Sequence, residues 1–322
     1  MTEVLILGGT GWLSGRIARR WRDAGARVTC LARGGRPVPD GTVLAQGDRD
    51  DASAYDALRR DWDEIVDISS LARHVREAVT ALGEHARRWT YVSSVSVYSD
   101  ETTVGADESA PLHPAARDDD DEYPGQKVAA EEAVRTLGER ARIVRPGLIV
   151  GPGDPSDRFG YWAAAFDRAD AEPVLVPPRA GCWTQIIDVD DVAAFVVRDR
   201  GRGAVNAVGI PHPLDELLTR VRAHTRHTGD VVEADAEWLA EREVGHWMGE
   251  RSLPLWLPAA MTGFAQRSNR AFLAAGGSLT PLEETIAKVV ADERERGVDR
   301  TRRAGLTRAE ELALLDELRS RA

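Results

Sequence analysis

Two side chains four residues apart, Tyr123 and Lys127, are suited to moving a proton. Pro124 is favoured in the first turn of a helix, so the sequence predicts that Tyr123 lies at a helix start and Lys127 one turn further along the same face. A phenol hydroxyl donates or accepts a proton, and a neighbouring lysine cation stabilises the phenolate and lowers the pKa of the tyrosine. A Tyr-x-x-x-Lys pair is common by chance, so its meaning depends on the elements that position it.

The first of those elements is a glycine-rich turn within residues 4–15, VLILGGTGWLSG. Its four leading apolar residues predict a buried strand, and a helix is expected to begin near Leu13. Glycines let the backbone turn tightly and approach a pyrophosphate, whose charge the N-terminus of the helix stabilises. The order of strand, turn and helix therefore predicts a dinucleotide-binding turn, and the alternative is an ordinary connection between a strand and a helix.

Further strands are expected at residues 27–32, 43–45, 64–68 and 90–92, in alternation with helices. This alternation predicts an α/β fold with a doubly wound parallel sheet of the Rossmann type. In such sheets, ligands bind beyond the carboxyl ends of the strands. Polar side chains follow the four strands at those ends, and they include Arg33, Asp48, Ser69 and Ser93.

Two of these residues bear on the kind of dinucleotide. An acid after the second strand usually binds the ribose 2′-hydroxyl of NAD, whereas an arginine there accommodates the 2′-phosphate of NADP. Arg33 stands at that position with Arg36 close by, so we expect NADP(H) as the favoured cofactor and NAD(H) as the other possibility. The alternative for Arg33 is a solvated basic turn. Asp48 follows the third strand, where an acid can accept a hydrogen bond from the adenine amino group.

The composition limits the partners of this chain. It has 322 residues, of which 43% are apolar and 30% charged, as in an ordinary globular protein, and its net charge of −11 argues against nucleic acid as the main partner. Two cysteines, Cys30 and Cys182, are too few for a disulfide framework, and the sequence shows neither a signal-peptide pattern nor a long apolar run. We therefore expect a cytoplasmic protein that binds a small-molecule substrate, as a monomer or homodimer, without a membrane or a metal.

Four motifs, in order, resemble those of the short-chain dehydrogenases/reductases, in the extended or atypical branch that forms the NAD-dependent epimerase/dehydratase superfamily. They are residues 8–13 (GGTGWL), residues 93–98 (SSVSVY), the Tyr123–Lys127 pair and residues 145–152 (RPGLIVGP), and residues 186–192 (IIDVDDV) are also typical. Residues 47–50 (GDRD) and 253–258 (LPLWLP) look like a bacterial subgroup of reductases or epimerases. That subgroup is related to chloroplast stem-loop RNA-binding proteins and isoflavone-reductase-like proteins.

The resemblance implies roles for particular residues. Tyr123 would be the catalytic acid/base, Lys127 would bind the nicotinamide ribose and tune Tyr123, and Ser94 would hold the substrate oxygen. Two places depart from the family pattern. Ser14 stands where the family has its third glycine, with Gly15 one place later, and Val95-Ser96 stands where sugar 4,6-dehydratases carry an Asp-Glu pair. Elimination of water by the dehydratase route is therefore not expected.

The second half of the chain is expected to be mainly helical and irregular, and the family would use it as a small substrate domain. Arg158 has the charge to bind an anionic substrate group, and Trp162 and Trp183 have rings on which a substrate can stack. The alternatives are a surface ion pair for Arg158 and a place in the core for the tryptophans. Capping boxes at residues 280–283 and 307–310 predict the starts of two late helices.

The sequence thus predicts an NAD(P)-dependent reductase that transfers hydride between nicotinamide and a carbonyl or alcohol through Ser94, Tyr123 and Lys127. The alternatives are an NAD-dependent sugar epimerase that retains its cofactor, and a non-catalytic nucleotide-sensing or RNA-binding relative. The dinucleotide-binding domain is expected over residues 1–152 and 183–206, and the substrate domain over 153–182 and 207–322. Candidate substrate residues are Ser96, Arg158, Trp162 and Trp183. Candidate cofactor residues are Gly8, Thr10, Gly11, Trp12, Leu13, Arg33, Asp48, Arg49, Ser69, Ser93, Lys127, Pro146, Gly147 and Leu148.

Overall fold

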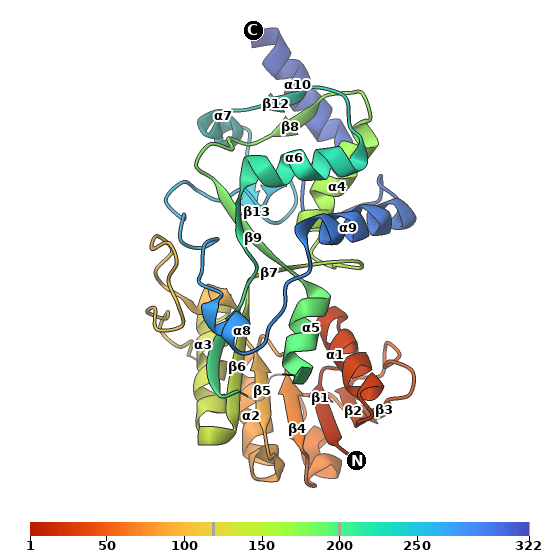
Figure 1. Ribbon diagram of the computed structural model, residues 1–322, viewed down its shortest axis with the longest axis vertical. Coiled ribbons are helices and arrows are strands. Elements are labelled where there is room, and N and C mark those ends of the chain that lie inside the picture. Colours follow the sequence, from red (N-terminus) through yellow and green to blue (C-terminus); the bar gives the residue numbers. More distant parts are fainter. Residues whose placement is uncertain (118–119, 199–200, 322) are drawn as a thin grey trace.

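A computed structural model describes residues 1–117, 120–198 and 201–321 (Figure 1). Its largest sheet has seven strands in the order β10-β6-β5-β4-β1-β2-β3, and every neighbouring pair is parallel. This is the predicted doubly wound α/β fold. The strands are β1 (Glu3–Leu7), β2 (Arg27–Ala32), β3 (Val43–Gln46), β4 (Glu64–Asp67), β5 (Trp89–Val92), β6 (Ala141–Pro146) and β10 (Gly203–Ala207).

Helices cover both faces of this sheet, which explains why residues 4–7 of β1 are apolar without alternation. In β1, Val4 and Ile6 pack with α1 (Trp12–Asp23) and α5 (Val189–Arg198), whereas Leu5 and Leu7 pack on the other face. That second face is covered by α2 (Ala72–Leu82) and α3 (Tyr123–Arg135). These four side chains are at most 1% exposed, so the strand is fixed between the two layers.

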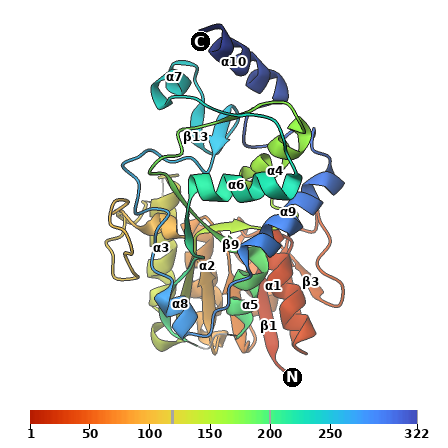
Figure 2. The same cartoon turned by 45° about the horizontal axis from the view of Figure 1, so that its top comes forward.

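The C-terminal part lies beyond the carboxyl ends of the strands and is mainly helical, as Figures 1 and 2 show. One large apolar cluster joins helices, short strands and the end of the chain there. The helices of this part are α4 (Arg158–Ala169), α6 (Leu214–Thr225), α7 (Ala236–Glu241), α9 (Leu282–Arg296) and α10 (Arg308–Arg321). Its paired strands are β8 (Val174–Val176) with β12 (Val231–Glu233), and β13 (Gly245–Trp247) with β14 (Ser252–Pro254).

A three-stranded sheet connects the main sheet to the C-terminal part. It consists of β7 (Leu148–Val150), β9 (Trp183–Asp188) and β11 (Pro211–Pro213), in the order β11-β9-β7. β9 therefore does not join the main sheet. The short helix α8 (Arg270–Ala274) packs back on α5, with the rings of Phe272 and Phe195 4.6 Å apart. The domain limits remain a prediction.

The two expected capping boxes have different outcomes. At α10 the Thr307 hydroxyl donates to the Glu310 carboxylate and accepts from the Glu310 amide, as predicted. At α9 the helix begins where predicted, at Leu282, but the capping box does not form, because the amide and hydroxyl of Thr280 both donate to the Asp191 carboxylate, at 2.6 and 2.9 Å. Pro281 takes the cap position of α9 instead. The fold brings the Asp191 carboxylate close to Thr280, and this contact replaces the expected one with Glu283.

Candidate functional site

The turn between β1 and α1 has the shape that a diphosphate requires. Gly8 has a φ of 97°, a conformation that side chains with a Cβ rarely adopt. At Gly9 a Cβ atom would lie 2.4 Å from the Cys30 sulfur, so the close contact between the turn and β2 needs glycine. Gly11 caps α1, and the first turn of the helix contains no acid to repel an anion.

Ser14, the departure from the glycine pattern, is built into this turn. Its hydroxyl donates to the Gly8 carbonyl at 2.5 Å and accepts from the Gly11 amide at 3.0 Å. The Ser14 side chain thus bonds to the backbone of the turn itself, which stabilises the turn. With glycines at the required places and the start of α1 behind them, the turn fits a dinucleotide.

Trp12 connects this turn to the start of the C-terminal part. Its indole nitrogen donates to the Pro152 carbonyl at 2.8 Å, and Arg16 donates to the same oxygen at 2.8 Å. Gly151 and Gly153 lie against the indole, where a Cβ atom at either position would be in van der Waals contact with it. The loop at residues 151–157, which leads to α4, is therefore anchored on α1.

The predicted catalytic side chains come together at the carboxyl ends of β4 and β5. Ser94 caps a short 3₁₀ turn, Val95–Val97, and its hydroxyl lies 3.1 Å from the hydroxyl of Ser96. Tyr123 is the first residue of α3, and the Lys127 amine lies 5.9 Å from its ring centre. The helix start and the shared face are as predicted.

Lys127 is held inside the protein. Only 2% of the residue is exposed, and its amine donates to the carbonyls of Ser69 and Val92 at 3.0 and 2.9 Å. Tyr91 adds its ring face, 4.8 Å from the same nitrogen. Burial lowers the pKa of Lys127 to about 7, against the opposing attraction of Asp67 and Glu131. An ammonium has three donors, so two fix its position and one remains for a ligand.

Tyr123 keeps 43% of its surface exposed, so its ring is open to a substrate. Partial burial raises the pKa of this phenol above its ordinary value, while a hydrogen bond with Ser94 and the charge of Arg158 act in the opposite direction. The phenol is therefore protonated near neutral pH. Ser94, Tyr123 and Arg158 are close enough to influence one another.

Arg49 does not lie free for a cofactor, contrary to its place among the candidate residues. Its guanidinium forms a two-pronged ion pair with Asp67, at 2.8 and 2.7 Å, and its remaining donors contact the Tyr55 hydroxyl and the His74 carbonyl. Asp67 ends β4 and is fully buried. The charge pair fastens the ends of β3 and β4 to α2, and it is a structural cross-link beneath the site.

The other candidate cofactor residues lie along the same edge of the sheet. Arg33 and Asp48 are exposed where β2 and β3 end, and Ser93 is buried where β5 ends. Ser69 follows β4 and accepts from both Lys127 and Tyr91 through its carbonyl oxygen. Pro146, Gly147 and Leu148 form the passage from β6 to β7, on the same side of the sheet.

The substrate candidates divide into two groups. Arg158 is half-buried at the start of α4, with its guanidinium 5.2 Å from the ring centre of Trp247. Trp162 was wrongly assigned to the substrate, because it is fully buried and donates its indole hydrogen to the Pro254 carbonyl. It packs against Tyr161 and Phe166 in the core, as the alternative interpretation held. Trp183 is half-buried at the start of β9.

Sequence reasoning missed two residues at this site. Asp67 was detectable in principle, because an acid in a strand predicted to be buried requires a partner. Trp247 carried no such signal: its position beside Arg158 follows from the unusual backbone of residues 243–255. Trp247 itself has a φ of 64°, which is rare for a bulky residue, and it also contacts Phe264 edge-on at 5.5 Å.

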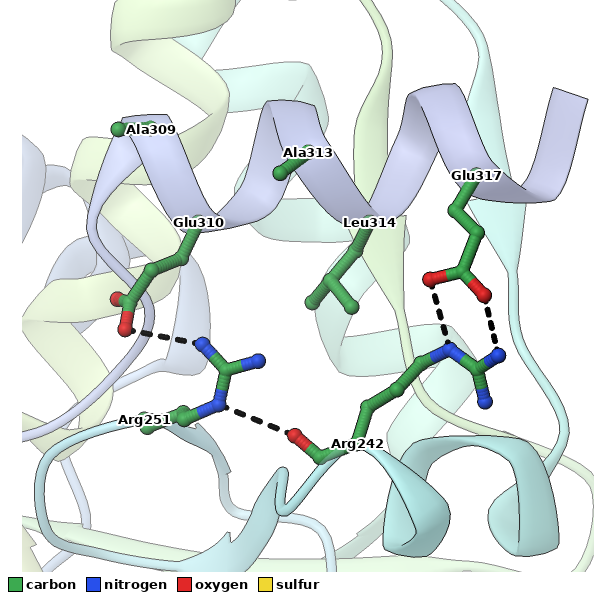
Figure 3. A pocket seen from close by; sticks show the side chains of 7 residues that line it. All are labelled: Arg242, Arg251, Ala309, Glu310, Ala313, Leu314 and Glu317. Atoms are coloured by element: carbon green, nitrogen blue, oxygen red, sulfur yellow. Dashed lines mark hydrogen bonds and ion pairs between the residues drawn. The ribbon is translucent and has the colours of Figure 1, made fainter. Parts of the chain in front are cut away.

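A cavity of about 400 Å³ lies elsewhere, between α10 and the turn that precedes β14 (Figure 3). None of the predicted site residues lines it. Its walls are Arg242, Arg251, Ala309, Glu310, Ala313, Leu314 and Glu317. Across the described residues no group of three or more histidine, cysteine or acidic side chains is arranged to hold a metal ion. No described helix is long and apolar enough to cross a membrane.

Comparison with known proteins supports a dinucleotide site at this edge. The sequence model of the NAD dependent epimerase/dehydratase family matches residues 4–200. Curated proteins yielded no sequence match.

Solved structures with the same fold include UDP-N-acetylglucosamine 4-epimerase from Bacillus cereus, at a TM-score of 0.68 and 14% identity over 94% of this chain and 99% of that one. UDP-glucose 4-epimerase from Thermotoga maritima, solved with UDP-glucose, gives 0.68 and 12% identity over 92% and 99%. The Bordetella bronchiseptica enzyme WbmH, solved with NAD⁺, gives 0.66 and 18% identity over 92% and 100%. At these identities the likeness concerns the fold alone.

Proposed function

Because this chain belongs to the NAD dependent epimerase/dehydratase family, we propose that it is an NAD(P)-dependent oxidoreductase acting on a carbonyl or alcohol carbon of a small molecule. One observation carries the proposal. Tyr123 and Lys127 share one face of α3 beside Ser94, at the carboxyl edge of the sheet where the glycine turn also lies. A nicotinamide bound there would supply or accept the hydride.

The side chains of the site divide the remaining work. The Ser94 hydroxyl orients the substrate oxygen, and Tyr123 passes a proton to or from that oxygen. Lys127 uses its third donor to hold the ribose, and its positive charge stabilises the phenolate that forms when Tyr123 gives up its proton. Gly8, Gly11 and the start of α1 hold the diphosphate.

Net reduction is the direction that we favour. The raised pKa of Tyr123 keeps the phenol protonated at neutral pH, which is the state that can donate to a newly formed alkoxide. Arg33 stands exposed at the end of β2, where a guanidinium can pair with the 2′-phosphate of NADP(H), and no acid competes at that position. Both features support an NADP(H)-dependent reductase.

A sugar epimerase is the second candidate, because solved epimerases of nucleotide sugars share this fold. An epimerase oxidises and reduces its substrate with one retained cofactor, whereas a reductase exchanges its cofactor at each turnover. The two differ in what the purified protein carries, so denaturing it and identifying the released nucleotide separates them. Retained stoichiometric NAD would establish the epimerase and contradict our assignment of Arg33.

For the reductase we expect an empty protein that binds NADPH more tightly than NADH. Arg33→Gln should then weaken NADPH binding about tenfold and leave NADH binding unchanged, since one charge-assisted contact is lost. In a screen of carbonyl compounds, Tyr123→Phe should abolish turnover and spare cofactor binding. Wild-type turnover in that variant would overturn the mechanism, and full biological activity without any turnover would point to a non-catalytic relative.

A further inference from the structure

The strongest unassigned feature beside the proposed site is the charge of Arg158. Nearly every other half-buried arginine that borders the C-terminal core has a carboxylate partner, as Arg168, Arg300 and Arg302 do. Arg158 has no carboxylate within ion-pair distance among the residues that the structure describes. Burial lowers its pKa, and the attraction of Asp154 and Tyr123 only partly compensates. A partly desolvated, unpaired cation is costly for a fold and is expected where a ligand supplies the counter-charge.

The surroundings of Arg158 orient its guanidinium. Asp154 is buried and accepts two hydrogen bonds from Ser156, at 2.8 and 2.9 Å. The Ser156 hydroxyl in turn lies 3.3 Å from Nε of Arg158. Nε is thereby engaged, and the terminal nitrogens of the guanidinium, which can bind two oxygens side by side, have no partner among the described residues.

Trp247 supports the same guanidinium from its ring face, at 5.2 Å. Its left-handed backbone, with a φ of 64°, is unfavourable for a tryptophan, and its amide donates to the Trp256 carbonyl at 3.1 Å. The Phe264 ring meets it edge-on. Strained backbone that holds an aromatic ring against an unpaired arginine is typical of a binding site.

We propose that Arg158 binds an anionic group of the substrate, a carboxylate or a phosphate, next to the carbon whose oxygen meets Ser94 and Tyr123. This deepens the proposed function and rests on it. The substrate class is then a small hydroxy or keto acid, or a phosphate ester. In UDP-glucose the reacting sugar ring is neutral, so an anion beside the reacting carbon separates this class from such a substrate.

Binding of unreactive anions to the full chain saturated with NADPH tests this directly, by calorimetry. One probe is 2-hydroxyisobutyrate, whose tertiary alcohol cannot be oxidised; its neutral amide is the matched control, and inorganic phosphate represents the phosphate source. We expect one of the two anions to bind at least about tenfold more tightly than the amide, since an arginine–anion contact of this kind is worth about 1.5–3 kcal/mol.

Arg158→Gln should remove that preference for the anion, whereas Arg158→Lys should retain part of it. Arg179→Gln is the control, because Arg179 is already paired with Asp215 and Glu233 and should leave anion binding unchanged. Unchanged anion binding in Arg158→Gln, or equal binding of the amide, would overturn the proposal and leave Arg158 only an electrostatic effect on Tyr123.

These experiments also distinguish failure of the anion-binding proposal from failure of the proposed redox activity. Arg158-dependent anion binding without any turnover in a redox screen would remove the proposed activity and leave the anion subsite. Tyr123-dependent turnover of neutral carbonyl compounds, without Arg158-dependent binding, would do the reverse. Whichever of 2-hydroxyisobutyrate and inorganic phosphate binds more tightly shows whether the substrate carries a carboxylate or a phosphate.

Discussion

At the scale of single residues, burial lowers the pKa of Lys127 to about 7. The fold encloses its amine between two carbonyl oxygens and the ring of Tyr91. Keeping that amine charged costs free energy in these surroundings, which is why its pKa is lowered. A buried lysine interacts with a nearby charge or dipole much more strongly than a lysine in water does. Its interaction energy therefore depends on the protonation state of Tyr123.

This environment gives stability a specific dependence on pH. The folded pKa of Lys127, about 7, lies below the ordinary value of 10.5, so between these values the unfolded chain binds more protons than the folded one. Raising the pH through this window therefore stabilises the wild type by several kcal/mol relative to Lys127→Met. Urea denaturation of the cofactor-free chain at pH 6.5 and 9.5 measures the difference.

The chain offers a matched control, because it contains only one other lysine, Lys288. Lys288 lies near the surface and pairs with Glu284 at 2.8 Å, which raises its pKa. Lys288→Met should therefore not reproduce the gain of wild-type stability on going from pH 6.5 to 9.5. A pH-independent difference between the wild type and Lys127→Met would show that the amine is not buried as described.

At the scale of elements, hydrogen bonds and one buried ion pair fix the loops at the carboxyl ends of the strands. The turn after β1 is closed by the Ser14 hydroxyl, and the ends of β3 and β4 are joined by the pair of Arg49 with Asp67. The loops that face a cofactor therefore need not fold around it. They are already held by hydrogen bonds that point into the protein.

The charge pair beneath these loops should be sensitive to the loss of one partner. Arg49→Met leaves the buried Asp67 carboxylate without its counter-charge, and we expect a loss of about 3–5 kcal/mol in the free energy of unfolding. Arg59→Met is the matched control, because Arg59 pairs with Asp56 on the surface and should change stability little. Adding Asp67→Leu to Arg49→Met should recover stability; no recovery would mean that Arg49 acts by packing alone.

Local signals in the sequence predicted most of these elements but not their partners. The strand at residues 27–32 matches the structure in both limits, since hydrophobic patterning and end signals depend only on neighbouring residues. Tyr123 and Lys127 were singled out by their spacing at a predicted helix start, and Ser94 by the family resemblance. The core position of Trp162, the ion pair of Arg49 and the place of Trp247 depend on segments far apart in sequence, which one sequence does not reveal.

At the scale of the whole molecule, a buried charge joins the last helix, α10, to the other elements of the C-terminal part. Glu311 of α10 is fully buried, accepts from the Leu175 amide and pairs with Arg168 and Arg308. Glu317 of the same helix is exposed and pairs with Arg242 at the rim of the cavity in Figure 3. Helix α10 thus has one buried glutamate, Glu311, and one exposed glutamate, Glu317, each in an ion pair.

These two glutamates should differ sharply when truncated. Glu311→Ala leaves Arg168 and a buried amide without a partner, and we expect it to destabilise the protein by about 3–5 kcal/mol. Glu317→Ala should have little effect, because solvent screens an exposed pair. Urea denaturation compares the two, and Glu311→Gln serves where the alanine variant does not fold. Similar effects at both positions would contradict the internal position of Glu311.

The hydrogen bonds of Trp12 and Arg16 to the single carbonyl of Pro152 would couple the two proposed binding events. Trp12 follows the turn that we propose for the cofactor, and Pro152 precedes the segment that ends in Arg158, which we propose for the substrate. A cofactor that restricts the motion of the first also restricts the second, so part of the entropy lost on binding substrate has already been lost. Thermodynamic linkage makes the effect reciprocal: substrate must increase cofactor affinity by the same factor. The chain is therefore expected to bind cofactor and substrate with positive cooperativity, each raising the affinity for the other.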